Sequence, residues 1–376
     1  MKTVGIIAEY NPFHKGHAYH IQRAKEITGA NYAVVIMNGD FVQRGEPAIY
    51  DKYTRTKQAL AGGADFVFEL PLRFGISSAG DFAYGGILAL HSLGFIDAVC
   101  FGSELGEITP LQEIAAFLVK ETESFQSLLN HFLRQGFSYP SARTLALTQT
   151  GQFDKTILRE PNNILGVEYC LSLLRLSSSI KPVTIPRIGE DYHGNINDVT
   201  YPSATTLRRQ ICHGNQPHMQ TDDLSGALGY ALLRSSDLTC YKDINSDLSD
   251  RLTRFIPDFT YFSDLVEKCH NPSITKGRIR RGLLQCLFDI EKTDNTMPYL
   301  RLLGMKKEAS SLLAGREETS CTILSRLAID SRRLNLQAHA LLQKDLFASD
   351  LYRQIWNRKY GTKLPNEYQH SPIVVD

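Results

Sequence analysis

The sequence predicts an α/β protein in which a doubly wound parallel sheet is followed by a mainly helical C-terminal domain. Three observations support this prediction. Apolar β-branched runs alternate with amphipathic segments in the first half of the chain, a His-x-Gly-His turn follows the first run, and strand signals fade after about residue 200. Since 376 residues exceed the size at which one core usually stops growing, we predict domains over 1–210 and 211–376.

The first half of the chain reads as alternating strands and helices. Residues 3–9 form an apolar run, residues 17–28 carry apolar side chains at helical spacing, and residues 32–37 form a second run. A strand, a helix and a strand in this order make a βαβ unit, which crosses over right-handed. The pattern continues with helices over 52–62, 79–93, 107–150 and 162–178, and strands over 65–69, 96–101 and 182–187.

Helical periodicity dominates the second half. It predicts helices over 246–255, 277–290, 319–328 and 335–346. Residues 251–376 carry 20 Lys and Arg against 14 Asp and Glu, whereas the first 250 residues carry 21 against 26. A basic C-terminal part fits a polyanionic partner, although an ordinary scatter of surface charge fits the same counts.

Composition argues against several other classes. No apolar stretch approaches the roughly 20 residues that span a bilayer, and no signal-peptide pattern follows Met1, so a cytoplasmic location without membrane contact is expected. The seven cysteines are widely spaced and form no CxxC pair. We therefore predict neither disulfides nor a metal site of recognisable spacing, and no obligate protein partner is indicated.

The turn after the first predicted strand carries His14, Lys15, Gly16 and His17 at the start of a helix. A helix N-terminus offers free N–H groups and a positive dipole end to a polyphosphate. Both imidazoles can donate hydrogen bonds to phosphate oxygens, and Gly16 lets a phosphate approach the backbone. We predict His14 and His17 as catalytic in nucleotidyl transfer; two surface histidines at a helix start are the alternative.

A polar cluster follows the second predicted strand: Asp40, Gln43, Arg44, Lys52 and Arg55. It could reach the nucleotide or an acceptor, while a solvated loop and helix face is the alternative. Asp40 is predicted as catalytic, as the partner of either a metal ion or an amine proton.

Several motifs occur in one order along the chain. They are VGIIAEYNPFHKGHAYH, MNGDFVQRGEPAIYDKYTRTKQAL, GADFVFELP, FGSE, PNNILGVEY, PSATTLRR, RIRRGLLQCL, YLRLLG and YQHSPIV. In these motifs the chain resembles the bacterial tRNA(Met) cytidine acetate ligases of the HxGH nucleotidyltransferase superfamily. The resemblance covers most of the chain and implies an HxGH nucleotidyltransferase-like sheet.

The resemblance implies an ATP-dependent ligase. Acetate and ATP would give acetyl-adenylate, and the acetyl group would pass to N4 of the wobble cytidine of elongator tRNA(Met). Mg²⁺ is expected with the ATP because it usually bridges phosphates with few protein ligands. A small-molecule nucleotidyltransferase of cofactor synthesis is the alternative on the same turn, but the long helical extension counts against it. A nucleic-acid-binding module with a vestigial ATP site is a third reading, which the retained histidines and Gly16 disfavour.

The resemblance also assigns site residues. ATP contacts would fall on Ile7, Ala8, Glu9, Tyr10, Asn11, Pro12, Phe13, His14, Lys15, Gly16, His17, Ala18, Tyr19, His20, Gly102, Asn162, Arg187 and Ile188. The segment at 202–208 resembles the superfamily signature ISSTxIR, with Ser203 and Thr205 as ligands and Arg208 as a catalytic clamp on pyrophosphate, although Pro202 and Ala204 depart from it. A strand-ending turn for Gly102, an N-cap for Asn162, a solvated Arg187 and a capped helix start for the signature are the structural alternatives.

Four cations lie within six positions and are predicted to bind tRNA phosphates: Lys276, Arg278, Arg280 and Arg281. Five more cations could extend this segment: Arg332, Arg333, Arg353, Arg358 and Lys359. Tyr352 and Trp356 could stack on an unpaired base, although such aromatic residues are more often part of a core.

Overall fold

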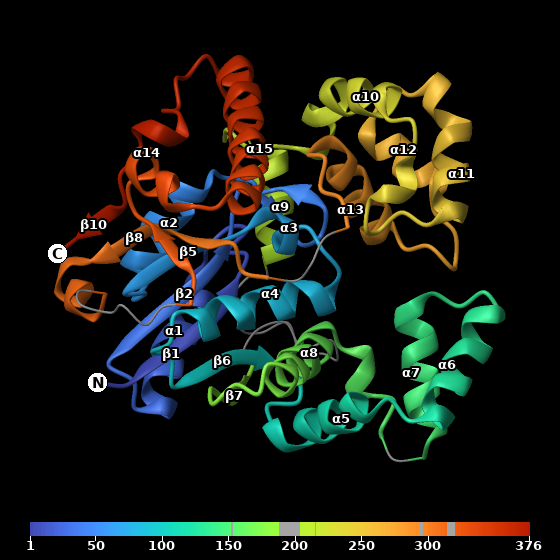
Figure 1. The fold of residues 1–376 in the computed structure, drawn as a ribbon, viewed down its shortest axis with the longest axis horizontal. Coiled ribbons are helices and arrows are strands. Elements are labelled where there is room, and N and C mark those ends of the chain that lie inside the picture. Colours follow the sequence, from blue (N-terminus) through green and yellow to red (C-terminus); the bar gives the residue numbers. More distant parts are fainter. Residues whose placement is uncertain (152, 188–203, 215, 293–295, 314–319) are drawn as a thin grey trace.

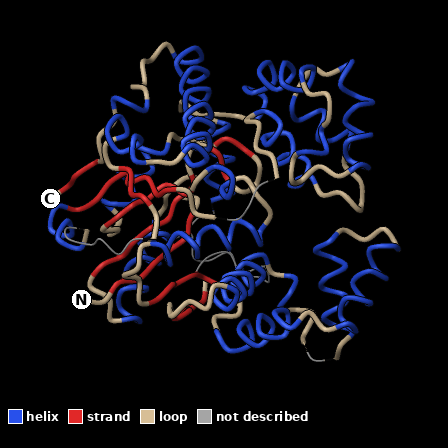
Figure 2. The backbone as a smooth tube through the Cα atoms, viewed as in Figure 1, coloured by secondary structure: helices blue, strands red, loops and turns tan. Residues whose placement is uncertain are grey.

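A mixed, mostly parallel sheet forms the centre of the computed structural model, which describes residues 1–151, 153–187, 204–214, 216–292, 296–313 and 320–376 (Figures 1 and 2). Its main path runs β10-β8-β5-β2-β1-β6-β7, and β9 pairs with β8. The five strands of the first half are parallel: β1 (Thr3–Ala8), β2 (Tyr32–Asn38), β5 (Phe66–Leu70), β6 (Ala98–Ser103) and β7 (Lys181–Pro186). The predicted doubly wound sheet is confirmed for this half.

The strand order reverses at β1. From β1 the chain adds β2 and β5 on one side, then β6 and β7 on the other. All five carboxyl ends therefore meet at one edge, where open α/β sheets bind ligands at the point of reversal. The His14–His17 turn follows β1 directly at this point.

Helices cover both faces of the sheet because its strands are apolar on both sides. On one face, α1 (Lys15–Thr28) and α2 (Lys52–Ala61) pack Ile21, Ala24 and Leu60 onto the sheet. The opposite face is covered by α4 (Ala79–Ser92), α5 (Ile108–Lys120) and α8 (Pro161–Arg175). The helices α6 (Glu123–Arg134) and α7 (Tyr139–Gln149) project beside this layer (Figure 1).

Three strands come from the C-terminal half, where the sequence predicts mainly helices. β8 (Tyr299–Lys306) lies antiparallel to β5, and β9 (Thr322–Leu324) and β10 (Ile373–Val375) lie parallel to β8. The helix predicted over 319–328 is wrong, because a strand precedes the short helix α14 (Leu327–Asp330) and residue 319 lies outside the described part. Periodicity cannot separate strand from helix in short apolar runs, and here the neighbouring strand decides.

The other C-terminal helices form a second core beside the sheet. Leucines of α10 (Ser225–Arg234), α11 (Ser246–Phe255), α12 (Phe262–Cys269) and α13 (Lys276–Leu287) pack together. The long α15 (Leu336–Tyr360) then returns to the sheet body. Residues 211–376 are thus mainly helical but contribute strands to the central sheet, so the division at residue 210 remains a prediction.

The remaining elements are short or isolated. A hairpin of β3 (Phe41–Val42) and β4 (Glu46–Pro47) follows β2, α3 (Leu72–Gly75) follows β5, and α9 (Ala204–His213) begins after the undescribed residues 188–203. Among the described residues, no helix is both long and apolar enough to cross a membrane.

Candidate active site

The turn between β1 and α1 is packed around a buried tyrosine. Tyr10 adopts a left-handed backbone conformation with φ of 49°, and its ring lies 4.9 Å from the ring of Phe13 and 4.8 Å from that of His17. A non-glycine residue in this conformation requires support from its surroundings, and these ring contacts supply it. The turn therefore presents His14 and His17 from a fixed support.

Two reciprocal hydrogen bonds hold the imidazoles. His14 is the N-cap of α1, and its Nδ1 accepts from the Gly16 N–H at 3.1 Å, while the Nδ1 of His17 accepts from the His14 N–H at 3.2 Å. The two rings stack with centroids 3.7 Å apart. Because each Nδ1 is an acceptor, each neutral ring carries its hydrogen on Nε2. Both imidazoles thus keep an Nε2–H donor that the cap does not use.

Burial keeps these histidines neutral. It lowers the pKa of His14 to about 4 and holds that of His17 well below the usual value, and the nearby Arg187 charge lowers both further. The pKa of His20 is also lowered by burial to about 4. At neutral pH the two rings of the turn therefore act as uncharged hydrogen-bond donors, not as cations.

The structure shows a second reason for a glycine at position 16, which the sequence does not reveal. A Cβ at this position would lie 2.9 Å from Cε1 and 3.0 Å from Nδ1 of His14. A side chain at Gly16 would therefore push the His14 ring from its capping position. The predicted close approach of a phosphate remains a prediction.

Gly102 and Arg187 lie together at the carboxyl edge. The Arg187 N–H donates to the Ser103 carbonyl at 3.1 Å, and a Cβ at Gly102 would lie 3.2 Å from the Arg187 Cγ. Arg187 is exposed, and its charge contributes to the lowered pKa values of all three histidines. The structure thus brings residues from three separate predicted segments to one place, while the predicted ligand Ile188 lies outside the described residues.

Asn162 does not occupy the predicted N-cap. The N-cap of α8 is Glu160, and Asn162 is the second residue of the helix. Its side-chain amide donates to Glu104, and that carboxylate also accepts the Asn163 N–H at 2.9 Å. Glu104 from the loop after β6 therefore occupies the helix start, a role that needs the tertiary structure to be seen.

Arg208 joins α9 to the histidine turn. Its guanidinium donates to the Asn11 carbonyl at 2.8 Å and to the Thr205 hydroxyl at 3.0 Å. The predicted clamp residue thus lies beside the turn across nearly 200 residues of sequence, although Ser203 falls outside the described residues.

The polar cluster after β2 divides into a buried part and an open part. Lys52 and Arg55 are buried, so the alternative of a solvated helix face is wrong for both. The Lys52 ammonium bonds the Glu69 carboxylate at 2.8 Å and lies 3.1 Å from Glu367. Arg55 donates to the carbonyls of Glu9 and Asn38 at 2.7 Å and 3.0 Å. Isolated buried charges are costly, and these pairings stabilise the loop by satisfying them.

Asp40 belongs to the buried part. Its exposed fraction is 5%, and its Oδ1 accepts the Lys52 N–H at 2.8 Å. Burial raises the pKa of Asp40 to about 6 against the opposing charge of Lys52. It lines a small pocket, open to solvent, together with Tyr53, Glu367 and His370. Its predicted catalytic role remains a prediction.

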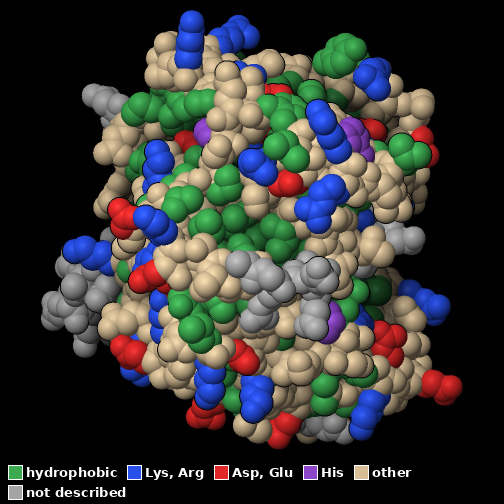
Figure 3. All heavy atoms as spheres, turned by 60° about the vertical axis from the view of Figure 1, so that its left-hand side comes forward, with side chains coloured by type: hydrophobic (Ala, Val, Ile, Leu, Met, Phe, Trp, Pro, Cys, Tyr) green, Lys and Arg blue, Asp and Glu red, His purple; other side chains and the backbone are tan. Residues whose placement is uncertain are grey.

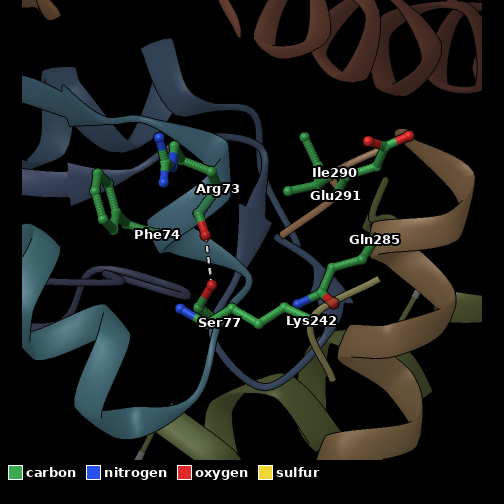
Figure 4. Close-up of a pocket in the computed structure, with 7 residues that line it drawn as sticks. All are labelled: Arg73, Phe74, Ser77, Lys242, Gln285, Ile290 and Glu291. Carbon is green, nitrogen blue, oxygen red and sulfur yellow. Dashed lines mark hydrogen bonds between the residues drawn. The ribbon is translucent and has the colours of Figure 1, made fainter. Parts of the chain in front are cut away.

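The more exposed part of the cluster comprises Gln43 and Arg44, which both interact with Glu9 after β1. The Glu9 Oε1 accepts the Gln43 N–H at 3.0 Å, and the charges of Arg44 and Arg208 act on this carboxylate. Gln43 also donates to the Ser77 carbonyl at 3.2 Å. Ser77 in turn lines a small pocket between the sheet body and the helical region, opposite Lys242 and Gln285 (Figure 4). This chain of contacts leads from the histidine turn to the junction of the two regions.

The four predicted tRNA-binding cations all have internal partners. Lys276 pairs with Glu267 at 2.6 Å, Arg278 donates to the Asp243 carbonyl at 2.8 Å, Arg281 bonds the Asp243 carboxylate at 2.9 Å, and Arg280 pairs with Glu46. Gly45, with φ of 77°, allows the hairpin to approach, since a Cβ there would lie 2.6 Å from the Arg280 Cβ. These residues therefore fix α13 to its neighbours, and their contact with tRNA remains a prediction.

Two of the five cations that could extend this segment also have acidic partners. Lys359 pairs with Asp223 at 2.7 Å and Arg353 with Asp350 at 3.0 Å. Tyr352 is buried and donates to the Ala48 carbonyl at 2.9 Å, so it is a core residue and cannot stack on a base. On the face shown in Figure 3, positive and negative side chains are interspersed.

No group of three or more His, Cys, Asp or Glu side chains in the described ranges is arranged to hold a metal ion. A divalent ion that binds mainly to phosphates needs few protein ligands. Mg²⁺ as a companion of the ATP phosphates remains a prediction.

The fold and the histidine turn define the class of nucleotidyl transferases. The family model described as HIGH Nucleotidyl Transferase matches residues 1–367. A tRNA(Met) cytidine acetate ligase of Caldicellulosiruptor saccharolyticus is 37% identical over 403 residues, which cover 100% of this chain and 99% of that protein. One from Acetivibrio thermocellus is 33% identical, with 100% of both chains covered.

Solved structures agree with this assignment. Thermotoga maritima TmcAL bound with alpha-thio ATP superposes with a TM-score of 0.88 at 27% identity, covering 100% of this chain and 99% of that one. Its apo form superposes with a TM-score of 0.87 at 28% identity, with both chains fully covered. The chain therefore belongs to the HIGH nucleotidyl transferase family and, within it, to the tRNA(Met) cytidine acetate ligases.

Proposed function

We propose that this protein is an ATP-dependent acetate ligase that acetylates N4 of the wobble cytidine in elongator tRNA(Met). The observation that carries the proposal is the pair of neutral imidazoles at the start of α1, whose Nε2–H groups have no hydrogen-bond partner among the described residues. Full-length similarity to ligases of that name, and to a relative solved with an ATP analogue, supports this use of the turn.

In the first step an acetate oxygen attacks the α-phosphorus of ATP, and the bond from that phosphorus to the bridging oxygen breaks. Pyrophosphate leaves and acetyl-adenylate forms. His14 and His17 would donate hydrogen bonds to the phosphate oxygens on which charge builds, where fixed donors are most effective. Arg208, which already contacts the turn, would neutralise the departing pyrophosphate.

The other ATP ligands would surround this turn. Gly102 and Arg187 lie at the adjoining strand ends, and Asn162 opens α8 beside Glu104. An open α/β sheet binds nucleotides at such a reversal of strand order. Mg²⁺ would accompany the triphosphate.

The test is an assay with ATP, labelled acetate and total tRNA, followed by nucleoside analysis. We expect labelled N4-acetylcytidine in elongator tRNA(Met) without acetyl-CoA. If the label never enters tRNA while ATP is present, the proposal is wrong. Pyrophosphate release driven by a phosphorylated metabolite alone would instead indicate a small-molecule nucleotidyltransferase.

A further inference from the structure

Glu9 is the first residue after β1 and is fixed at both its backbone and its side chain. Its carbonyl accepts from the buried Arg55 guanidinium at 2.7 Å. Its Oε1 accepts the Gln43 N–H at 3.0 Å. The carboxylate therefore has a defined position in the connection between β1 and α1, shortly before His14 in the chain.

The second oxygen of Glu9 is uncommitted. Within the described ranges, Oε2 receives no hydrogen bond, and the residue is half-buried, not sealed in the core. Asp40 differs, because its Oδ1 accepts the Lys52 N–H, its Oδ2 lies 3.9 Å from the Lys52 ammonium, and the residue is buried. Asp40 also lines a pocket open to solvent, but both of its oxygens face Lys52, whereas Glu9 keeps one oxygen that no described residue engages.

The charged groups facing Glu9 come from three segments. Arg44 and Glu46 belong to the hairpin after β2, and Arg208 belongs to α9. The third segment is α8, where the Glu9 charge contributes to the raised pKa of the Tyr169 phenol. Burial raises the pKa of Glu9, while Arg44 and Arg208 oppose that rise. The result is a carboxylate more basic than usual beside two guanidinium groups.

The second step of the proposed reaction needs a base. The amine lone pair of cytosine is delocalised into its ring, so N4 is a weak nucleophile. As the N4–carbonyl carbon bond forms, the carbon–oxygen bond to the adenylate phosphate breaks, AMP leaves, and N4 gives up one proton. A positioned carboxylate can accept that proton in the transition state.

We infer that Glu9 Oε2 takes the proton from the acceptor amine in the transfer step. The inference rests on the proposed function. It assigns the two steps to two parts of one turn: the histidines hold the phosphates, and the preceding glutamate receives the acceptor.

The experiment compares Glu9→Gln with the matched control Glu46→Gln. Each substitution removes one negative charge from the same cluster, and the amide introduced by Glu9→Gln would keep an oxygen that can accept the Gln43 N–H. Acetate-dependent exchange of pyrophosphate into ATP reports the first step, and acetylation of tRNA reports both steps. Thermal unfolding of each variant shows whether the fold is retained.

Because Glu9 also lies in the predicted ATP-binding segment, the two steps are compared within one variant. For Glu9→Gln we expect the ratio of the transfer rate to the exchange rate to fall by about 10²-fold or more, in the range for loss of a general base. Glu46→Gln should retain both activities. In the wild type, transfer should slow as pH falls through the pKa of Glu9, and this acidic limb should be absent in Glu9→Gln. A Glu9→Asp variant should be slower but keep the limb.

An equal loss of exchange and transfer in Glu9→Gln would overturn the inference and leave the proposed function intact. Transfer within about threefold of the wild type, or an unchanged acidic limb, would overturn it as well. Should Glu9→Gln fail to fold, loss of the limb in Glu9→Asp is the overturning result. Absence of both activities in the wild type would remove the proposed function, and the inference with it.

Discussion

The histidine turn and the basic face of α13 are both predicted to contact phosphates, yet their polar groups are used in opposite ways. At the turn, backbone N–H groups bind the Nδ1 atoms of His14 and His17, and the Nε2–H donors have no partner in the part of the chain that the structure describes. On α13, each cation from Lys276 to Arg281 has an acidic or carbonyl partner in this protein. A phosphate-binding site therefore depends on which polar groups the fold leaves without an internal partner, and the number of charges in a segment does not reveal this.

The largest expected effect is at the turn. His14→Ala and His17→Ala should each lower the rate of acetate-dependent pyrophosphate exchange by about 10²–10³-fold, because each removes one donor to the transition state. Binding of tRNA should change little, as measured by filter retention. An equal loss of tRNA affinity would contradict the separation of the two regions.

A smaller effect is expected at Arg281, in the middle of α13. Arg281→Met would leave the Asp243 carboxylate, 12% exposed, without its charged partner. We expect a loss of about 1.5–3 kcal/mol in the free energy of unfolding, the range for a hydrogen bond to a charged group. Urea denaturation measures it. A loss of tRNA affinity with unchanged stability would show instead that Arg281 serves RNA and not the fold.

Protonation of His14 should make a modest contribution to the pH dependence of the free energy of unfolding. The pKa of His14 is about 4 in the folded state and 6.5 when exposed, so the unfolded chain binds the proton first as pH falls. This contribution to stability is present above pH 6.5 and is lost between about 6.5 and 4. Since His14 is half-buried and partly screened by solvent, we expect a loss on the order of 1 kcal/mol. Urea denaturation of the wild type and His14→Ala should show their difference shifting against the wild type at low pH, and a constant difference would contradict this.

The smallest effect on stability is expected at the exposed end of α13. Lys276 and Glu267 form a surface pair, so Lys276→Met should change the free energy of unfolding by less than about 1 kcal/mol. If the ammonium also contacts an RNA phosphate, the slope of log affinity against log salt should fall by about 1. An unchanged slope would remove Lys276 from the RNA contact and widen the contrast with the turn.

Local sequence determined the part of the site that needs only neighbours in the chain. A buried strand, a turn and an amphipathic helix suffice to place His14 and His17 at a helix start, so the predicted βαβ unit with the histidines at this position is confirmed. Their catalytic role stays a prediction. The parallel strands can also be predicted from local sequence, because their apolar runs are long and bounded by turns.

Tertiary structure decided what depends on partners far away in the chain. Only the fold shows that β8 pairs antiparallel with β5, that Glu104 occupies the start of α8, and that Lys52 is buried between Glu69 and Glu367. The physical reason is that a polar group has the same sequence signature whether it is solvated or paired. Its availability is set by desolvation and by partners, and both arise only when the chain folds.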